Sequence, residues 1–151
     1  MTGAVRIRCA ESRDFEAVTA LLEELGRPRV GESERAPCRA VYEAQLGDPD
    51  AAHLVAVDEQ GGVVGFCSLH FRTRLNQVSS EAWMPDLIVT ERARRAGAGS
   101  AMLAEADRLA AERGCHYLTL ESGLQREDAH RLYRRFFGRD EGGYTFHKRP
   151  G

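Results

Sequence analysis

The chain has 151 residues, of which 42% are hydrophobic and 29% charged, with a formal net charge of -2. This length suits one domain with a core of its own, and the charge balance argues against a nucleic-acid partner. No apolar stretch is long enough to span a bilayer, and the N-terminus lacks the apolar run of a signal peptide. We therefore expect a single domain over residues 1–151, located in the cytoplasm and with no membrane partner.

The cysteines and histidines show no pattern of a disulfide framework or a metal site. Cys9, Cys38, Cys67 and Cys115 are widely spaced and form no Cys-x-x-Cys pair. Free thiols in a reducing compartment are the expected state of such cysteines. The five histidines also lack metal-ligand spacing, and we expect no metal.

The first half of the chain predicts strands and helices in a regular order. Alternating apolar residues indicate strands, and apolar residues at helical spacing indicate helices. Ser12 is expected to cap the first helix, and Gly26 to end it. The predicted elements are a strand over 5–9, a helix over 13–25, a helix over 34–46, and a hairpin of strands over 53–57 and 63–71.

The second half is predicted to contain a strand–helix–strand unit, which implies parallel pairing of its two strands. Pro85 lies inside the first of these strands and cannot donate a ladder hydrogen bond, so a bulge or a break in pairing is expected there. The predicted elements are a strand over 81–89, a helix over 97–113, a strand over 117–120, a helix over 126–137 and a short strand over 144–147.

The most informative segment is the glycine loop between the strand over 81–89 and the long helix. Its sequence is Arg-Arg-Ala-Gly-Ala-Gly-Ser over residues 94–100. The two glycines let backbone N–H groups approach a ligand without obstruction by Cβ atoms. The helix start adds unpaired N–H donors and the positive end of the helix dipole, and the arginines add positive charge. This combination predicts a site for a pyrophosphate.

Two other phosphate-binding motifs compete for this segment. The P-loop requires four residues between its glycines and then a lysine, and neither condition is met. The dinucleotide fingerprint begins with Gly97 and Gly99, but Met102 occupies the position of its third glycine. Glu121 stands where an acidic ribose ligand is expected, so a dinucleotide-dependent reductase remains an alternative.

The motif Arg94-x-x-Gly97-x-Gly99, in this order of elements, resembles the acetyl-CoA motif of the GNAT superfamily of N-acetyltransferases. The helix over 126–137 and the ending over 144–148 are also similar to the last helix and the closing strand of that family. The resemblance implies a mixed α/β fold with a central, mostly antiparallel sheet flanked by helices. It also implies acetyl-CoA as co-substrate, with the pantetheine arm beside the strand and the pyrophosphate over the loop. The implied cofactor-binding residues are Leu87, Ile88, Val89, Arg94, Arg95, Ala96, Gly97, Ala98, Gly99 and Ser100.

The resemblance also implies catalytic roles. Tyr133 would be the general acid beside the sulfur of CoA, and Asp86 or Glu81 would serve as the general base, with Asp86 preferred. Strand alternation places Asp86 on one face with Met84 and Ile88, and a bulge at Pro85 would change that parity for Glu81. Relatives usually have a glycine four residues after the tyrosine, whereas Gly138 follows Tyr133 by five, which predicts a remodelled helix end.

The resemblance leaves the acceptor open: it is a primary amine of a small molecule or of a peptide. A homodimer is possible, since family members often dimerise. A second alternative is a domain that binds acyl-CoA as a sensor without turnover.

Overall fold

The computed structural model describes residues 3–122, 127–138, 140 and 142–151. Contacts within the chain divide it into two compact units, with the boundary between Glu121 and Ser122. The first unit contains β1 (Arg6–Cys9), α1 (Phe15–Leu25), α2 (Glu32–Leu46), β2 (Ala51–Val57), β3 (Val63–Arg72), β4 (Glu81–Val89), α3 (Ala98–Glu112) and β5 (Tyr117–Leu120). The second unit contains α4 (Glu127–Phe137).

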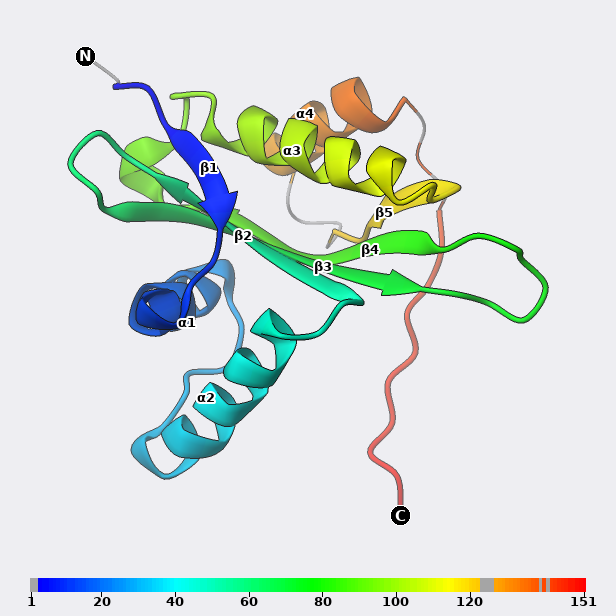
Figure 1. The fold of residues 1–151 in the computed structure, drawn as a ribbon, viewed down its shortest axis with the longest axis horizontal. Helices are drawn as coiled ribbons and strands as arrows, with labels where there is room; N and C mark the ends of the chain where they lie inside the picture. The colour runs from blue at the N-terminus through cyan, green and yellow to red at the C-terminus, as the bar shows by residue number, and fades with distance from the viewer. Residues whose placement is uncertain (1–2, 123–126, 139, 141) are drawn as a thin grey trace. The chain divides into compact units, whose positions relative to one another are not determined.

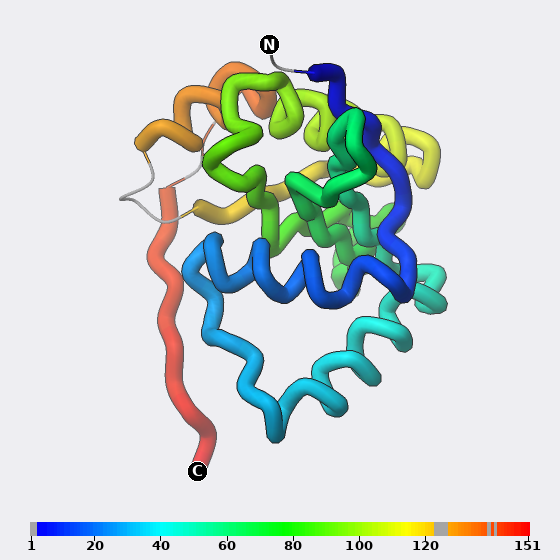
Figure 2. Tube along the Cα trace, turned by 90° about the vertical axis from the view of Figure 1, so that its left-hand side faces the viewer, coloured from blue at the N-terminus to red at the C-terminus, as the bar shows by residue number. Residues whose placement is uncertain are grey.

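The strands of the first unit form one sheet in the order β1-β2-β3-β4-β5 (Figure 1). The first three pairings are antiparallel, and β4 pairs with β5 in parallel. Helices α1 and α2 cover one face of the sheet, and α3 covers the other. Residues 26–31 connect α1 to α2 within their layer (Figure 2). The predicted mixed α/β fold with a mostly antiparallel sheet is confirmed.

The face under α1 and α2 contains an aromatic and aliphatic core. Phe15, Val18 and Leu21 lie on one side of α1 and are almost fully buried, as their helical spacing requires. They pack against side chains from the sheet and from α2, namely Tyr42, Val55, Val57, Phe66 and Ile88.

The opposite face of the sheet packs against α3 through small and flexible residues. Gly65 on β3 lies beneath this helix, where an added Cβ would come within 2.9 Å of the Met102 Cε atom and 3.2 Å of the Ile88 carbonyl oxygen. Met102, Leu103 and Ala106 are completely buried. The absence of a side chain at position 65 therefore sets how closely α3, and the loop before it, approach the sheet.

The start of α1 differs from the expected serine cap. The Asp14 carboxylate accepts a hydrogen bond from the Glu11 backbone N–H at 2.8 Å, while the Ser12 hydroxyl donates to Glu43 on α2. Asp14 is 4% exposed and receives two hydrogen bonds from the Arg8 guanidinium, at 2.7 and 3.0 Å. These bonds from Arg8 lower the pKa of Asp14. A buried carboxylate paired with arginine thus fixes the entry to α1.

The predicted irregularity at Pro85 is present. The β3–β4 register shifts between Ser68 and His70, so that Leu69 lies opposite both Met84 and Pro85. On the other side of β4, the pairing with β5 ends at Met84. Because proline lacks an N–H group, Pro85 cannot donate a ladder hydrogen bond, and the pairing of β4 with β3 resumes at Asp86 beyond this extra residue.

The expected strand over 144–147 is wrong. Residues 142–151 carry no strand pairing, and Tyr144 and Phe146 are 89% and 91% exposed. Alternation along a chain describes which side chains share a face, but a strand also needs a ladder partner for its backbone groups. In the described part of the chain, no helix has the length and apolar content needed to cross a membrane.

Candidate functional site

The edge of β4 beyond Pro85 is unpaired on one side in the described part of the chain. Pairing with β5 covers Glu81 to Met84, whereas pairing with β3 continues to Val89. The backbone of residues 86–89 therefore has a neighbouring strand on its β3 side only. An unpaired strand edge presents N–H and C=O groups that can bind an extended ligand.

The alternation of the antiparallel ladder determines which backbone groups face this open edge. The Thr90 N–H donates to the Val64 carbonyl on β3 at 2.8 Å. Two residues earlier, the Ile88 N–H must also face β3, whereas Leu87 and Val89 present their backbone groups to the open edge. Leu87 and Val89 therefore offer edge donors, while Ile88 contributes a buried side chain to the core beneath α1.

The N-terminus of α3 lies at the end of the loop that follows β4. The first intrahelical hydrogen bond joins the Ala101 N–H to the Gly97 carbonyl at 3.0 Å. The N–H groups of residues 98–100 therefore have no acceptor within the helix. No side chain caps this end, and its first turn has no acidic residue. Gly97 has a φ of +79°, and an added Cβ would meet no atom within 4 Å. The helix end is thus open and electropositive, which suits an anionic ligand.

The two loop arginines have different environments. Arg94 donates from Nε to the Val89 carbonyl at 3.0 Å, and its Nη2 atom lies 3.8 Å from Glu24 of α1. Arg95 is exposed and has a φ of +75°, the one positive value at a non-glycine residue in the described chain. A left-handed arginine is strained, and such strain is typical of functional loops. The guanidinium of Arg94 is thus engaged by the protein, and that of Arg95 faces solvent.

Glu24 fixes the start of this loop to α1. Its carboxylate accepts hydrogen bonds from the Thr90 hydroxyl at 2.9 Å and from the Glu91 backbone N–H at 3.0 Å. Together with the ion pair to Arg94, these contacts couple α1 to the segment between β4 and α3. Glu24 belongs to no motif in the sequence, because its partners are more than 60 residues away along the chain.

Asp86 lies at the bulge, next to the open edge of β4. One carboxylate oxygen accepts a hydrogen bond from the Ser68 hydroxyl at 2.9 Å, and the other accepts from Nε of Arg27, also at 2.9 Å. Nη2 of Arg27 donates to the Pro85 carbonyl at 2.8 Å. The candidate base is therefore hydrogen-bonded through both oxygens.

The bulge alters which residues share a face with Asp86. Trp83 packs against His70 on the α1–α2 side, where Ile88 also lies. Met84, the next residue, must point to the opposite face. Asp86 thus shares a face with Ile88, as expected, but not with Met84, because the extra residue at Pro85 reverses the alternation.

Glu81 lies at the opposite end of β4, about 16 Å from Asp86 at the usual rise of a strand. Its carboxylate accepts two hydrogen bonds from Arg72, each at 3.3 Å. Burial raises the pKa of Glu81, but hydrogen bonds from Thr119 and Arg72 outweigh this effect and leave the pKa below its usual range. Glu81 is therefore hydrogen-bonded to residues of both neighbouring strands, Arg72 on β3 and Thr119 on β5.

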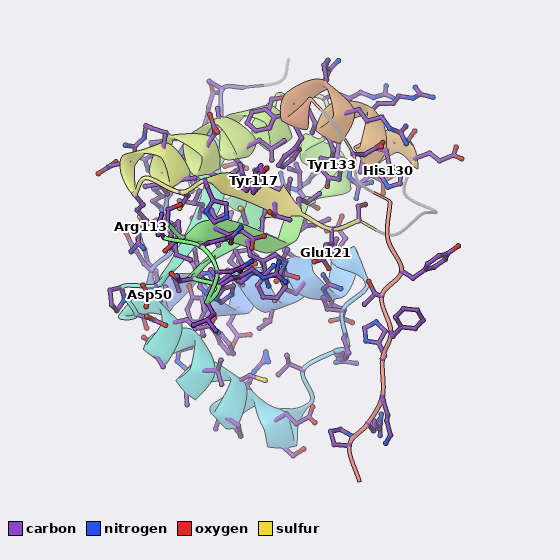
Figure 3. All side chains as sticks on the ribbon, turned by 90° about the vertical axis from the view of Figure 1, so that its right-hand side faces the viewer. Asp50, Arg113, Tyr117, Glu121, His130 and Tyr133 are labelled. Carbon is purple, nitrogen blue, oxygen red and sulfur yellow. The ribbon has the colours of Figure 1, made fainter. Side chains whose placement is uncertain are left out.

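Tyr133 belongs to the second unit. It lies on α4, as does His130 (Figure 3). The Nε2 atom of His130 is 3.2 Å from the Ser122 hydroxyl. The ring of Tyr133 packs edge-on against Phe137, with 6.4 Å between the ring centroids. The helix continues to Phe137 and is followed by Gly138, which has a φ of +80°. The general-acid role of Tyr133 stays a prediction.

A row of polar residues that no sequence motif indicates crosses three strands. His53 on β2 lies opposite Ser68 on β3, which lies opposite Asp86 on β4. Serine, histidine and aspartate invite comparison with a nucleophilic triad, but the contacts differ. The Ser68 hydroxyl donates to Asp86, and the Nε2 atom of His53 lies 2.7 Å from Gln45. Ser68 therefore holds a carboxylate in place and is not activated by a histidine.

Burial and the nearby His70 lower the pKa of His53. His53 is 6% exposed and is therefore a neutral, buried ring at physiological pH. In the described chain, no group of three or more His, Cys, Asp or Glu side chains is arranged to hold a metal ion. The four cysteines are free thiols.

Comparison with known proteins identifies the family. The family model described as "Acetyltransferase (GNAT) family" matches residues 17–138. The chain therefore belongs to the GNAT acetyltransferase family, whose members use acetyl-CoA. The matches favour neither the reductase nor the sensor interpretation.

The chain is also similar to individual proteins and solved structures. The chain is 32% identical over 129 residues to the aminoalkylphosphonate N-acetyltransferase of Salmonella typhimurium, covering 85% of this chain and 81% of that protein. A transcriptional regulator from Bacillus halodurans has a TM-score of 0.85 at 27% identity and covers 95% of this chain and 99% of its own. AAC(6')-Iy, in complex with the bisubstrate analogue CoA-S-monomethyl-acetylneamine, shares the fold with a TM-score of 0.80 at 18% identity, covering 98% of this chain and 100% of its own.

Proposed function

We propose that this protein transfers the acetyl group of acetyl-CoA to a primary amine of a small molecule or peptide by direct attack on the thioester. The observation that carries the proposal is the continuity of two binding elements. The edge of β4 is open from Asp86 to Val89, and a short loop connects it to the uncapped N-terminus of α3. A ligand with an extended amide chain and a diphosphate needs both elements.

The diphosphate would bind at residues 95–100. The N–H groups of the first turn of α3 would donate to its oxygens, and the helix dipole would favour its charge. Arg95 would supply the positive side chain, because Arg94 is already bonded to Val89 and Glu24. The open space at Gly97 suits the close approach of a phosphate group to the backbone.

The pantetheine arm would pair with the open edge of β4. Leu87 and Val89 would provide the backbone partners, in the manner of a strand added to a sheet. An edge N–H of one of these residues would also polarise the thioester carbonyl and stabilise the negative charge that forms on its oxygen.

The transfer requires two proton movements. The acceptor ammonium loses a proton to Asp86, the free amine attacks the carbonyl carbon, and the carbon–sulfur bond breaks. The departing thiolate of CoA takes a proton, for which Tyr133 is the proposed donor. Glu81 is the less favoured base, because it lies on the part of β4 that pairs with β5, away from the open edge.

The acceptor would approach from the side of the sheet covered by α1 and α2, where Asp86 lies. An amine acceptor is supported by the relative named for aminoalkylphosphonates, which are primary amines.

An assay of thiol release from acetyl-CoA with a panel of primary amines tests the proposal. We expect release to depend on the amine and to yield the N-acetyl product by mass spectrometry. Binding of acetyl-CoA without release for every amine would contradict turnover and favour the acyl-CoA sensor. In a parallel thermal-shift screen, stabilisation by NAD or NADP and none by CoA would contradict the acetyl-CoA site itself.

A further inference from the structure

Arg27 reaches from the end of α1 to the bulge of β4. Its Nε and Nη2 atoms contact an Asp86 oxygen at 2.9 Å and the Pro85 carbonyl at 2.8 Å. The backbone of Arg27 is fixed, because its N–H donates to the Leu22 carbonyl at 3.0 Å beyond the left-handed Gly26. A guanidinium is thus held against the candidate base from a rigid point of attachment.

This ion pair leaves the Asp86 carboxylate without a free oxygen for an incoming amine. The second oxygen accepts from the Ser68 hydroxyl, which also accepts from the Asp86 N–H at 3.1 Å. Ser68 is 3% exposed and lies opposite Asp86 in the ladder, so the hydrogen bond between Ser68 and Asp86 is part of the packed sheet. Only the contact between Arg27 and Asp86 can be displaced without disturbing the core.

The two partners are unequally accessible. The Arg27 side chain is 52% exposed and that of Asp86 is 20% exposed. An exposed ion pair of this kind contributes little to stability, so exchange of its partners costs little. Beyond Asp86 and Pro85, Arg27 has no other ion pair or side-chain hydrogen bond among the described residues. Its remaining N–H groups are therefore available to an anion.

We infer that Arg27 selects acceptors that carry an acidic group close to the amine. In this exchange, the ammonium group of the acceptor takes the place of Arg27 on Asp86, and its phosphonate, sulfonate or carboxylate binds the released guanidinium. The acceptor then pairs with both the Asp86 carboxylate and the Arg27 guanidinium, which it has separated. A simple alkylamine pairs with Asp86 only and leaves Arg27 unpaired. The inference rests on the proposed function and identifies its acceptor class as short zwitterionic amines.

The test compares acceptors in Arg27→Gln and in a matched control, Arg29→Gln. Arg29 is exposed, lies two residues further along and has no hydrogen bond or ion pair in the described structure. Initial rates are measured with 2-aminoethylphosphonate, β-alanine and propylamine, and acetyl-CoA binding is measured by calorimetry. Arg27→Lys is a third variant, which keeps the charge but loses the planar pair of donors.

For the unmodified protein, we expect a higher kcat/KM with the two zwitterionic acceptors than with propylamine. Arg27→Gln should lower kcat/KM for the zwitterions about 10- to 100-fold, the loss expected for a hydrogen bond to a charged group. It should leave propylamine unchanged or improved, and acetyl-CoA affinity unchanged. Arg27→Lys should fall in between, and Arg29→Gln should match the unmodified protein.

Four results would overturn the inference. An equal loss for all acceptors in Arg27→Gln would make Arg27 a structural support for Asp86, and an unchanged preference would make it irrelevant to selection. A preference for propylamine in the unmodified protein would contradict the acceptor class while leaving the acetyltransferase intact. If the unmodified protein binds no acetyl-CoA and acetylates no acceptor, the proposed function fails first and the inference fails with it.

Discussion

Glu24 on α1 accepts a hydrogen bond from the Thr90 hydroxyl, with 2.9 Å between the two oxygens. This contact, together with the bond from the Glu91 N–H, ties the chain that leaves β4 to a helix on the opposite side of the sheet from α3. The loop proposed to hold the diphosphate is therefore positioned by a residue that need not touch the ligand.

Glu24→Ala should loosen this loop. We expect KM for acetyl-CoA to rise about 10-fold, because the loop must then be ordered by the ligand, with a smaller change in kcat. Steady-state kinetics measures both quantities. Glu23→Ala is the matched control, since Glu23 is exposed and has no side-chain partner in the described structure. Equal effects of the two substitutions would contradict a specific role of Glu24.

Arg95→Gly should change stability and affinity in opposite directions. Glycine relieves the strain of a φ of +75°, so the free energy of unfolding should rise by about 1 kcal/mol. Affinity for acetyl-CoA should fall, because the exposed guanidinium is the proposed partner of the diphosphate. Urea denaturation and calorimetry measure the two effects. A variant with unchanged affinity would show that Arg95 does not face the ligand.

Arg94→Gly is the matched control for this substitution. Arg94 has a φ of -64°, so glycine offers no relief there, and the contacts to Val89 and Glu24 are lost. We expect this variant to lose stability.

Gly97→Ala tests whether the backbone at the start of α3 contacts the ligand. An alanine at a φ of +79° should lower the free energy of unfolding by about 1 kcal/mol. It should also weaken acetyl-CoA binding about tenfold, or about 1.4 kcal/mol, since its Cβ enters the open space in front of the helix.

Gly61 provides a close control for Gly97. It lies in the β2–β3 turn with a φ of +85°, and an added Cβ there also meets no atom within 4 Å. Gly61→Ala should therefore cost a similar amount of stability and leave acetyl-CoA binding intact. A parallel loss of binding in both variants would attribute the effect at Gly97 to stability alone.

His53 should make stability depend on pH. Its pKa in the folded state is lowered below the ordinary 6.5 by burial and by His70. Below about pH 6.5 the unfolded chain binds a proton that the folded chain does not, so the free energy of unfolding should fall as the pH decreases. Asp14 acts in a separate window, because its lowered pKa removes stability only as the pH falls below 3.8.

His53→Gln should reduce the loss of stability between pH 6.5 and pH 5, at the cost of a lower stability at pH 7. Urea denaturation across this range measures the slope. A slope identical to that of the unmodified protein would show that the buried ring titrates like a histidine in solvent.

Tyr133→Phe tests the proposed general acid. Loss of the hydroxyl should lower kcat about 100-fold, a typical contribution of a positioned proton donor. The dissociation constant of acetyl-CoA, measured by calorimetry, should stay the same. Phe136→Leu on the same helix is the control for disturbed packing. An unchanged kcat in Tyr133→Phe would remove this residue from the mechanism.

Much of the fold could be predicted from local pattern. Apolar periodicity gave the elements of the sheet and its helices, and Pro85 gave the irregularity in β4, because these signals depend on neighbouring residues only. The strand over 144–147 was wrong, since alternation does not reveal whether a partner strand exists. The reversal of faces before Asp86 also required the ladder, because the position of the extra residue is a property of two strands.

The sequence indicates the candidate site only as far as the glycine motif extends. The glycine loop could be located from its residues, but the contact of Arg27 with Asp86 joins positions 59 residues apart. Glu24 is likewise remote from the loop that it holds. Such charged residues on a helix surface look solvated in the sequence, and only the packing of α1 against the sheet reveals their partners.

The central claim is that an open strand edge and the uncapped start of α3 together bind acetyl-CoA. Calorimetric titration of the unmodified protein with acetyl-CoA tests it most directly. We predict one site per chain, with a dissociation constant of about 1 μM to 1 mM, the usual range for enzyme substrates. The absence of a binding signal throughout this range would contradict the account.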